Sequence, residues 1–139
     1  MRAYLWAKKG RLEEALSGRL AARYGGPWSP PGLPAVYAAL EPGAGALELL
    51  IHLNADPSVL RAFGLYTLEL PDEPVAVHVG FDRPWEVGQA FLLAGRRYAL
   101  KVPSRAVPGG WNLLINPRHP AFSELKIRPE PEGSPLFRR

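Results

Sequence analysis

Two kinds of hydrophobic pattern succeed each other irregularly along this chain. Short apolar or alternating runs bounded by turn residues predict strands, as at 111–115, where Trp-Asn-Leu-Leu-Ile precedes an Asn-Pro turn. Apolar residues three and four apart predict a helix at 11–23, which Gly18 interrupts. The expected strands are 3–6, 35–39, 65–70, 75–81, 97–102, 111–115 and 125–127. The expected helices are 11–23, 44–53, 85–93 and a short one begun by Asp56-Pro57.

This order of elements predicts an α+β fold. There is no regular strand–helix–strand alternation and no internal repeat, so we expect a mixed β-sheet with flanking helices. A length of 139 residues suits a single compact domain. We expect the domain to cover residues 1–128 and a Pro/Arg-rich tail to cover 129–139.

Composition narrows the class of protein. The chain has no cysteine, which excludes disulfides, thiolate catalysis and Cys-ligated zinc. It has no apolar run near the roughly 18 residues of a membrane span, and no signal peptide at its N-terminus. We therefore expect a cytoplasmic protein without a membrane partner.

The net charge of +4 favours an anionic partner in general terms. The arginines are spread from Arg2 to Arg139, and no interleaving of basic and aromatic residues resembles a stacking platform for single strands. Direct nucleic-acid binding is therefore not expected. A basic solvated surface, an acidic protein partner or a phosphate-bearing small ligand each fit this charge.

The segment 25–32 (Gly-Gly-Pro-Trp-Ser-Pro-Pro-Gly) combines conformational freedom with stiffness. The pair Gly25-Gly26 allows positive φ or close approach of the backbone, and the prolines stiffen the loop around Trp28. One interpretation is a rigid turn carrying a buried Trp28. The other is the rim of a pocket.

Glu48 is an unusual residue in its helix. Its neighbours are apolar nearly all round, and only Glu48 and His52, four residues apart, are polar. Such a helix is mostly buried, so its polar face meets either solvent or a polar cleft. Two residues without a third ligand do not indicate a metal site, and we expect none. Ser104, which closes an expected strand, lacks the partners of a nucleophile and fits a turn serine.

Four sequence blocks, in this order, resemble the RES domain family. They are Ala15–Gly18 followed by Tyr24-Gly25-Gly26-x-Trp28, Val36-Tyr37 with Glu48 eleven residues beyond, Leu100–Ser104, and Asn112-Leu-Leu-Ile-Asn-Pro-x-His-Pro120. No single block is specific, but together they span most of the chain.

The resemblance implies a fold related to ADP-ribosyltransferases and a bacterial toxin partnered by an antitoxin with a helix-turn-helix domain. The implied activity is degradation of NAD at the nicotinamide–ribose bond, by hydrolysis or phosphorolysis, with NAD as substrate and no further cofactor. Glu48 would stabilise the positive charge that develops on the ribose. Ser104 would position ribose or nicotinamide. Tyr37 and Trp28 would line the pocket, and Gly25 and Gly26 would form its rim.

Two arginine positions of the family pattern are replaced in this chain. Pro27 stands where the family has an arginine before the Trp, and an ungapped count puts the other family arginine at Ala7. Neither residue can grip a diphosphate as a guanidinium does, though Lys8, Lys9 or Arg23 could supply charge. Whether the chain is an enzyme is therefore open. The alternatives are a catalytically degenerate homologue that acts as a protein-binding module, and an ADP-ribosyltransferase acting on a protein.

Overall fold

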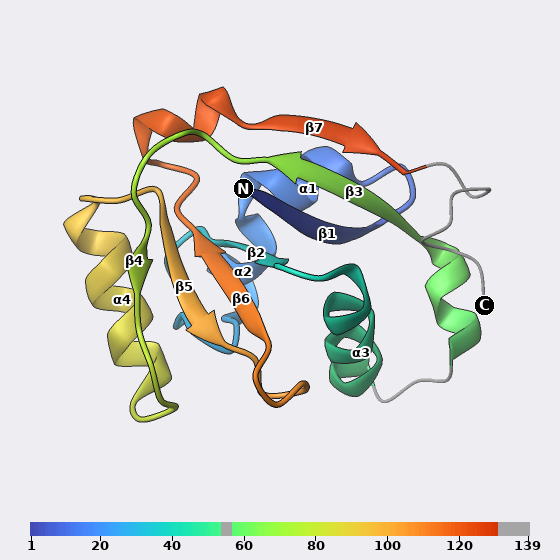
Figure 1. Ribbon diagram of the computed structural model, residues 1–139, viewed down its shortest axis with the longest axis horizontal. Coiled ribbons are helices and arrows are strands. Elements are labelled where there is room, and N and C mark those ends of the chain that lie inside the picture. The colour runs from blue at the N-terminus through green and yellow to red at the C-terminus, as the bar shows by residue number, and fades with distance from the viewer. Residues whose placement is uncertain (54–56, 131–139) are drawn as a thin grey trace.

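The computed structural model describes residues 1–53 and 57–130, without the side chains of Leu49, His52, Leu53 and Pro57. A seven-stranded mixed sheet with the order β4-β5-β6-β2-β1-β3-β7 forms its centre (Figure 1). The strands are β1 (Arg2–Lys8), β2 (Val36–Ala39), β3 (Phe63–Glu69), β4 (Ala76–Val77), β5 (Ala99–Pro103), β6 (Trp111–Ile115) and β7 (Lys126–Pro129). The β4–β5 pair is parallel and every other pair is antiparallel. The expected α+β fold is thus confirmed.

Helices cover both faces of this sheet. They are α1 (Leu12–Ser17), α2 (Arg19–Tyr24), α3 (Pro42–Leu53) and α4 (Pro84–Ala94), with the 3₁₀ helices η1 (Pro57–Ala62) and η2 (Pro120–Glu124). The helix expected at 11–23 is two helices, because Gly18 takes φ +74° between them. A Cβ at Gly18 would lie 2.6 Å from the backbone nitrogen of Ala35, so packing also requires a glycine at this break.

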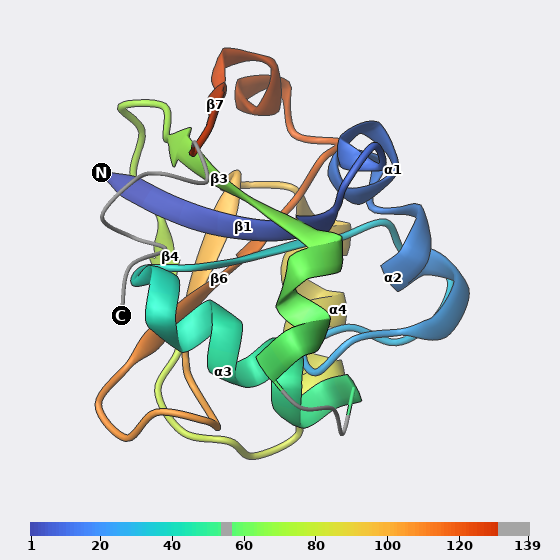
Figure 2. The same cartoon turned by 90° about the vertical axis from the view of Figure 1, so that its right-hand side faces the viewer.

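The two faces of the sheet carry separate cores. Directly paired residues of antiparallel strands point to the same face, so the registers sort the side chains. One face bears a cluster that packs against α1 and η2: Ala3, Leu5, Val36, Ala38, Leu113, Ile115 and their neighbours. The other bears a cluster around Trp28, Leu100, Val102 and Leu114, which packs against α4. Figure 2 shows α1 and η2 on one side of β1 and β3, with α3 on the other.

The expected strand 75–81 is wrong over most of its length. Only Ala76 and Val77 pair with β5 at the sheet edge, opposite Leu100 and Lys101. Val79 is exposed, and Gly80 takes φ +92° and turns the chain away. The alternating valines match the strand pattern, but beyond Val77 no strand of the described residues is paired with them. The expected boundary between domain and tail near residue 128 stays a prediction, because 131–139 lie outside the described residues.

Candidate functional site

A cavity of about 840 Å³ opens on the sheet face that carries α3 and α4. Five of the six residues expected at the site line it: Gly25, Gly26, Trp28, Tyr37 and Glu48. The sixth, Ser104, contacts Glu48 directly. The structure therefore brings all six residues together from the α2–β2 loop, β2, α3 and the end of β5.

The Glu48 carboxylate is fixed by two neighbouring side chains. The Ser104 hydroxyl donates to Oε1 at 2.5 Å, and Asn112 Nδ2 lies 2.6 Å from both Oε1 and Oε2. Glu48 extends from α3, whereas Asn112 lies on β6 beside Ala39 and Val102 and shares their face of the sheet. The polar face of the apolar helix thus meets a polar cleft, and Glu48 is partly buried there. The side chain of His52 lies outside the described residues.

Ser104 is itself held by the turn that follows β5. Its Oγ accepts hydrogen bonds from the backbone N–H groups of Ala106 at 3.2 Å and Val107 at 3.1 Å. Its own N–H donates to the Gly110 carbonyl at 2.9 Å. Two incoming N–H groups direct the hydroxyl proton toward Glu48, so Ser104 is a turn serine and a partner of the carboxylate at once.

The two adjacent glycines are needed for different reasons. Gly25 ends α2 with φ +77°, and its N–H donates to the Ala21 carbonyl at 2.8 Å. A Cβ at Gly26 would lie 2.6 Å from the ring and hydroxyl of Tyr37. The close approach expected of this pair is therefore made to a tyrosine ring, which lies between the loop and the sheet.

Tyr37 joins the loop to the sheet through its hydroxyl. That hydroxyl accepts from the Trp28 N–H at 3.0 Å and shares a 2.6 Å hydrogen bond with Ser29 Oγ. Burial raises the pKa of the Tyr37 phenol above its usual range, although the hydrogen bonds to Ser29 and Trp28 act in the opposite direction. Tyr37 is therefore a neutral phenol at physiological pH.

Helix α4 also contacts this loop. Trp85 Nε1 donates to the Gly26 carbonyl at 2.6 Å. One turn further on, a Cβ at Gly88 would lie 1.4 Å from the Trp28 carbonyl oxygen, so the helix backbone contacts the loop backbone. Trp28 is only 2% exposed and forms an edge-to-face contact with His78, with ring centroids 5.6 Å apart. The loop is thus both a turn carrying a buried tryptophan and the rim of a cavity.

The two positions expected to have lost an arginine differ in the structure. Alternation along β1 puts Tyr4 and Trp6 on the cavity face, whereas Ala7 is buried on the opposite face. An arginine at position 7 would point away from the cavity. The ungapped count therefore assigns the family arginine to the face of β1 that lies opposite the cavity. Pro27 lies exposed in the turn closed by Gly26 and Ser29, and it lines the rim.

Sequence reasoning missed three residues of the site. Asn112 is the polar member of an otherwise apolar central strand, a signal that was available. Trp6 lines the cavity beside Gly45, and its Nε1 donates to the Pro42 carbonyl at 3.1 Å. Arg105 also lines the cavity, directly after Ser104.

Neither a metal nor a membrane span is indicated by the described part of the chain. Residues 1–53 and 57–130 contain no group of three or more His, Asp or Glu placed to hold a metal ion. None of their helices has the length and apolar character needed to cross a bilayer.

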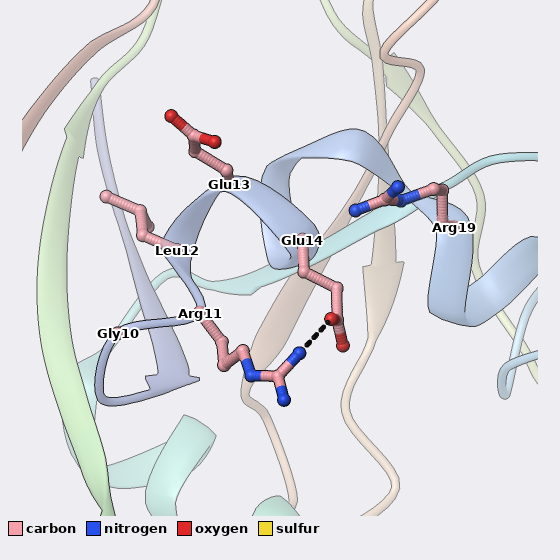
Figure 3. Close-up of a pocket in the computed structure, with 6 residues that line it drawn as sticks. All are labelled: Gly10, Arg11, Leu12, Glu13, Glu14 and Arg19. Atoms are coloured by element: carbon pink, nitrogen blue, oxygen red, sulfur yellow. Dashed lines mark hydrogen bonds and ion pairs between the residues drawn. The ribbon is translucent and has the colours of Figure 1, made fainter.

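A second, smaller hollow of about 440 Å³ lies over α1 (Figure 3). Three of its four charged side chains have partners on the same surface: Arg11 pairs with Glu14 at 2.9 Å, and Arg19 Nε donates to Ser17 Oγ at 3.1 Å. It contains none of the residues expected at the site. The large cavity is therefore the candidate functional site.

Known proteins are similar to this chain over most of its length. A family model described as the RES domain matches residues 2–135. A protein named "Toxin Res" from Pseudomonas putida is 37% identical over 125 residues, covering 83% of this chain and 86% of that protein. A "Prs ADP-ribosylating toxin" from Sphingobium sp. is 36% identical over 140 residues, covering 88% and 86%.

The fold is also similar to a solved structure, that of the M. tuberculosis MbcT–MbcA toxin–antitoxin complex. The TM-score is 0.71 at 23% identity, with 91% of this chain and 80% of the matched chain covered.

Proposed function

The chain belongs to the RES domain family, and from that premise we propose that it is the toxin of a toxin–antitoxin system and degrades NAD. The reaction is cleavage of the bond between nicotinamide and ribose, with water or phosphate as the acceptor. The observation that carries this proposal is the Glu48 carboxylate, held by Ser104 and Asn112 within a cavity that has aromatic walls.

Glu48 suits the charge that this reaction develops. When the bond from C1 of the ribose to the pyridine nitrogen breaks, nicotinamide leaves with the electron pair and becomes neutral. Positive charge then moves to the ribose ring, where a fixed carboxylate stabilises it. Because Ser104 and Asn112 already orient the carboxylate, little reorganisation is needed as the charge forms.

The aromatic side chains suit the flat leaving group. Tyr37 and Trp28 line the same cavity as the carboxylate. The Tyr37 hydroxyl is engaged by the loop, so this residue contributes its ring to the wall and its hydroxyl to the shape of the loop. The acceptor then adds to C1 of the ribose, giving ADP-ribose with water or its 1-phosphate with inorganic phosphate.

The test is release of nicotinamide from NAD by the purified chain. We expect release by the wild-type protein and a loss of about 10²–10³-fold in kcat for Glu48→Gln, which keeps the shape but removes the charge. Glu124→Gln removes an exposed carboxylate of η2 that is not among the cavity-lining residues, and should leave the rate unchanged. Product chromatography with and without phosphate identifies the acceptor.

A wild-type rate no higher than that of Glu48→Gln would contradict the enzyme assignment. The chain would then be a catalytically degenerate homologue that acts by binding another protein.

Transfer of ADP-ribose to a protein is a second candidate, because a relative of 36% identity is named an ADP-ribosylating toxin. It uses the same bond cleavage with a protein side chain as acceptor. Radiolabel from the adenylate of NAD would remain with protein in this case, and would appear as free ADP-ribose or its phosphate in the other. The Glu48→Gln variant is the control for both outcomes.

The proposed partner is an antitoxin with a helix-turn-helix domain. The proposed location, the cytoplasm, is the one expected for a toxin that acts on NAD. Leu20, Tyr24, Ile51 and Trp85 are exposed and line the cavity, which gives its mouth the apolar side chains that partner surfaces use. Co-expression with the product of a neighbouring gene that encodes such a domain should yield a complex that releases no nicotinamide.

A further inference from the structure

The cavity carries one charge of each sign. Among its described lining residues, Glu48 and Arg105 are the charged ones, and the rest are apolar, aromatic or neutral. Arg105 follows Ser104 in the chain, so its Cα lies about 3.8 Å from that of the residue bonded to Glu48. The two charged residues are therefore joined through one neighbour, Ser104, although no ion pair links these two described side chains.

The backbone around Arg105 is fixed, whereas its guanidinium is available. The Ser104 hydroxyl spans the turn by accepting from the N–H groups of Ala106 and Val107. The guanidinium carbon lies 5.3 Å from the centroid of the Phe81 ring. None of the ion pairs within residues 1–53 and 57–130 involves Arg105. Its N–H donors can thus take a ligand without breaking an existing ion pair.

Other basic residues are placed differently. Lys8, Lys9 and Arg23 do not line the cavity, and Arg23 lies over the Tyr24 ring at 5.2 Å. Lys101 lies over Trp111 at 4.6 Å, also away from the lining. Within the described residues, a cationic contact inside the cavity must therefore come from Arg105.

NAD matches this pair of charges. Its nicotinamide ring is positive and its diphosphate carries two negative charges. Resting on the proposed function, we propose that Arg105 binds the diphosphate of NAD. The dinucleotide then enters with nicotinamide toward Glu48 and diphosphate toward Arg105, because the reverse orientation would bring like charges together. A planar guanidinium can donate two parallel hydrogen bonds to phosphate oxygens, which also fixes the register of the ligand.

The kinetic test compares two substrates. Arg105→Gln should raise KM for NAD about tenfold, the lower end of what a hydrogen bond to a charged group supplies, because the side chain is exposed. Its kcat should stay within about twofold, since the ribose separates the diphosphate from the bond that breaks. KM for nicotinamide riboside, which has no phosphate, should be the same in variant and wild type.

Two further variants calibrate the effect. Arg105→Lys keeps the charge but loses the pair of parallel N–H donors. Its KM for NAD should lie between those of the wild type and Arg105→Gln. Arg118→Gln removes an exposed arginine that does not line the cavity, and should leave both KM values unchanged.

A binding measurement separates this inference from the proposed activity. Titration calorimetry with ADP-ribose is carried out on Glu48→Gln and on the double variant Glu48→Gln/Arg105→Gln, and the second should bind about tenfold more weakly. Equal affinities, or an unchanged KM for NAD in Arg105→Gln, would overturn the role of Arg105. Absence of nicotinamide release by wild type would instead overturn the proposed activity, and the titration would still decide the role of Arg105.

Discussion

Two parts of the cavity wall differ in what their hydrogen bonds achieve. Around Glu48, the bonds from Ser104 and Asn112 hold a charged group at the cavity wall. Around the Gly25–Gly32 loop, the bonds of Tyr37 and Trp85 are made to the loop itself and present no charge. The first network prepares a reacting group. The second maintains a shape.

This difference shows which parts of the site can vary. A carboxylate that must meet a developing charge tolerates little displacement, so its partners converge from β5 and β6. A diphosphate extends over several ångströms, so a cation can meet it from more than one direction. On this proposal, the loop can carry Pro27 while Arg105, in the turn after β5, supplies the charge.

The largest effect is expected from loosening the Glu48 network. Asn112→Ala leaves the carboxylate with Ser104 alone, and misplacement of a reacting group costs up to about 10²-fold in kcat. The free energy of unfolding should fall only through the lost Nδ2 hydrogen bonds to Glu48, because Asn112 Oδ1 is buried without a hydrogen-bond partner among the described residues. Steady-state kinetics and a thermal unfolding curve of the same sample measure both quantities.

Gln89→Ala is the matched control, since it truncates an exposed amide on α4. A kcat for Asn112→Ala equal to that of Gln89→Ala would mean that Ser104 alone orients Glu48.

A substitution in the hydrogen-bonded Gly25–Gly32 loop should mainly affect the stability of the fold. Gly26→Ala forces a Cβ against the Tyr37 ring, whose position is fixed by Trp28 and Ser29, so the free energy of unfolding should fall by about 1–3 kcal/mol. Gly43→Ala adds the same methyl group to α3 where nothing lies within 4 Å, and should be neutral or stabilise by about 0.5–1 kcal/mol. Denaturant titration of the pair measures the contrast. Equal stabilities would show that the loop yields to the added methyl group.

The smallest effect should come from adding charge to the rim. Pro27→Arg puts a guanidinium at an exposed position that lines the cavity, and exposed ion pairs contribute about 0.2–1 kcal/mol. KM for NAD should therefore fall by up to about fivefold relative to Pro27→Gln, which loses the proline without gaining charge. An unchanged ratio of the two KM values would indicate that the diphosphate does not pass this side of the mouth.

Much of the fold follows from local patterns. The strand at 111–115 and the helix at 85–93 were predicted nearly as they occur, since apolar periodicity and turn residues mark both. The strand expected at 75–81 shortened to two residues because pairing depends on a partner strand, which periodicity does not reveal. The broken helix at Gly18 likewise reflects a distant contact, with Ala35.

The candidate site was predictable where a polar residue stands among apolar neighbours in the sequence. Glu48 was such a residue, as a carboxylate in an apolar helix. Asn112 had the same signal in an apolar strand, yet its partner lies 64 positions away and on another element. Arg105 was missed because charge was sought at positions 7 and 27, whereas the side from which a cation reaches the cavity depends on sheet register and on a turn.

Gly88 bears on how such a site can change over time. The contact between its backbone and that of Trp28 excludes every larger side chain at position 88. The course of the loop is therefore enforced from the helix, independently of the side chain at its tip. The residue at position 27 can then be substituted without loss of the native fold. Affinity for an anion can therefore be lost or regained in evolution while the fold stays the same.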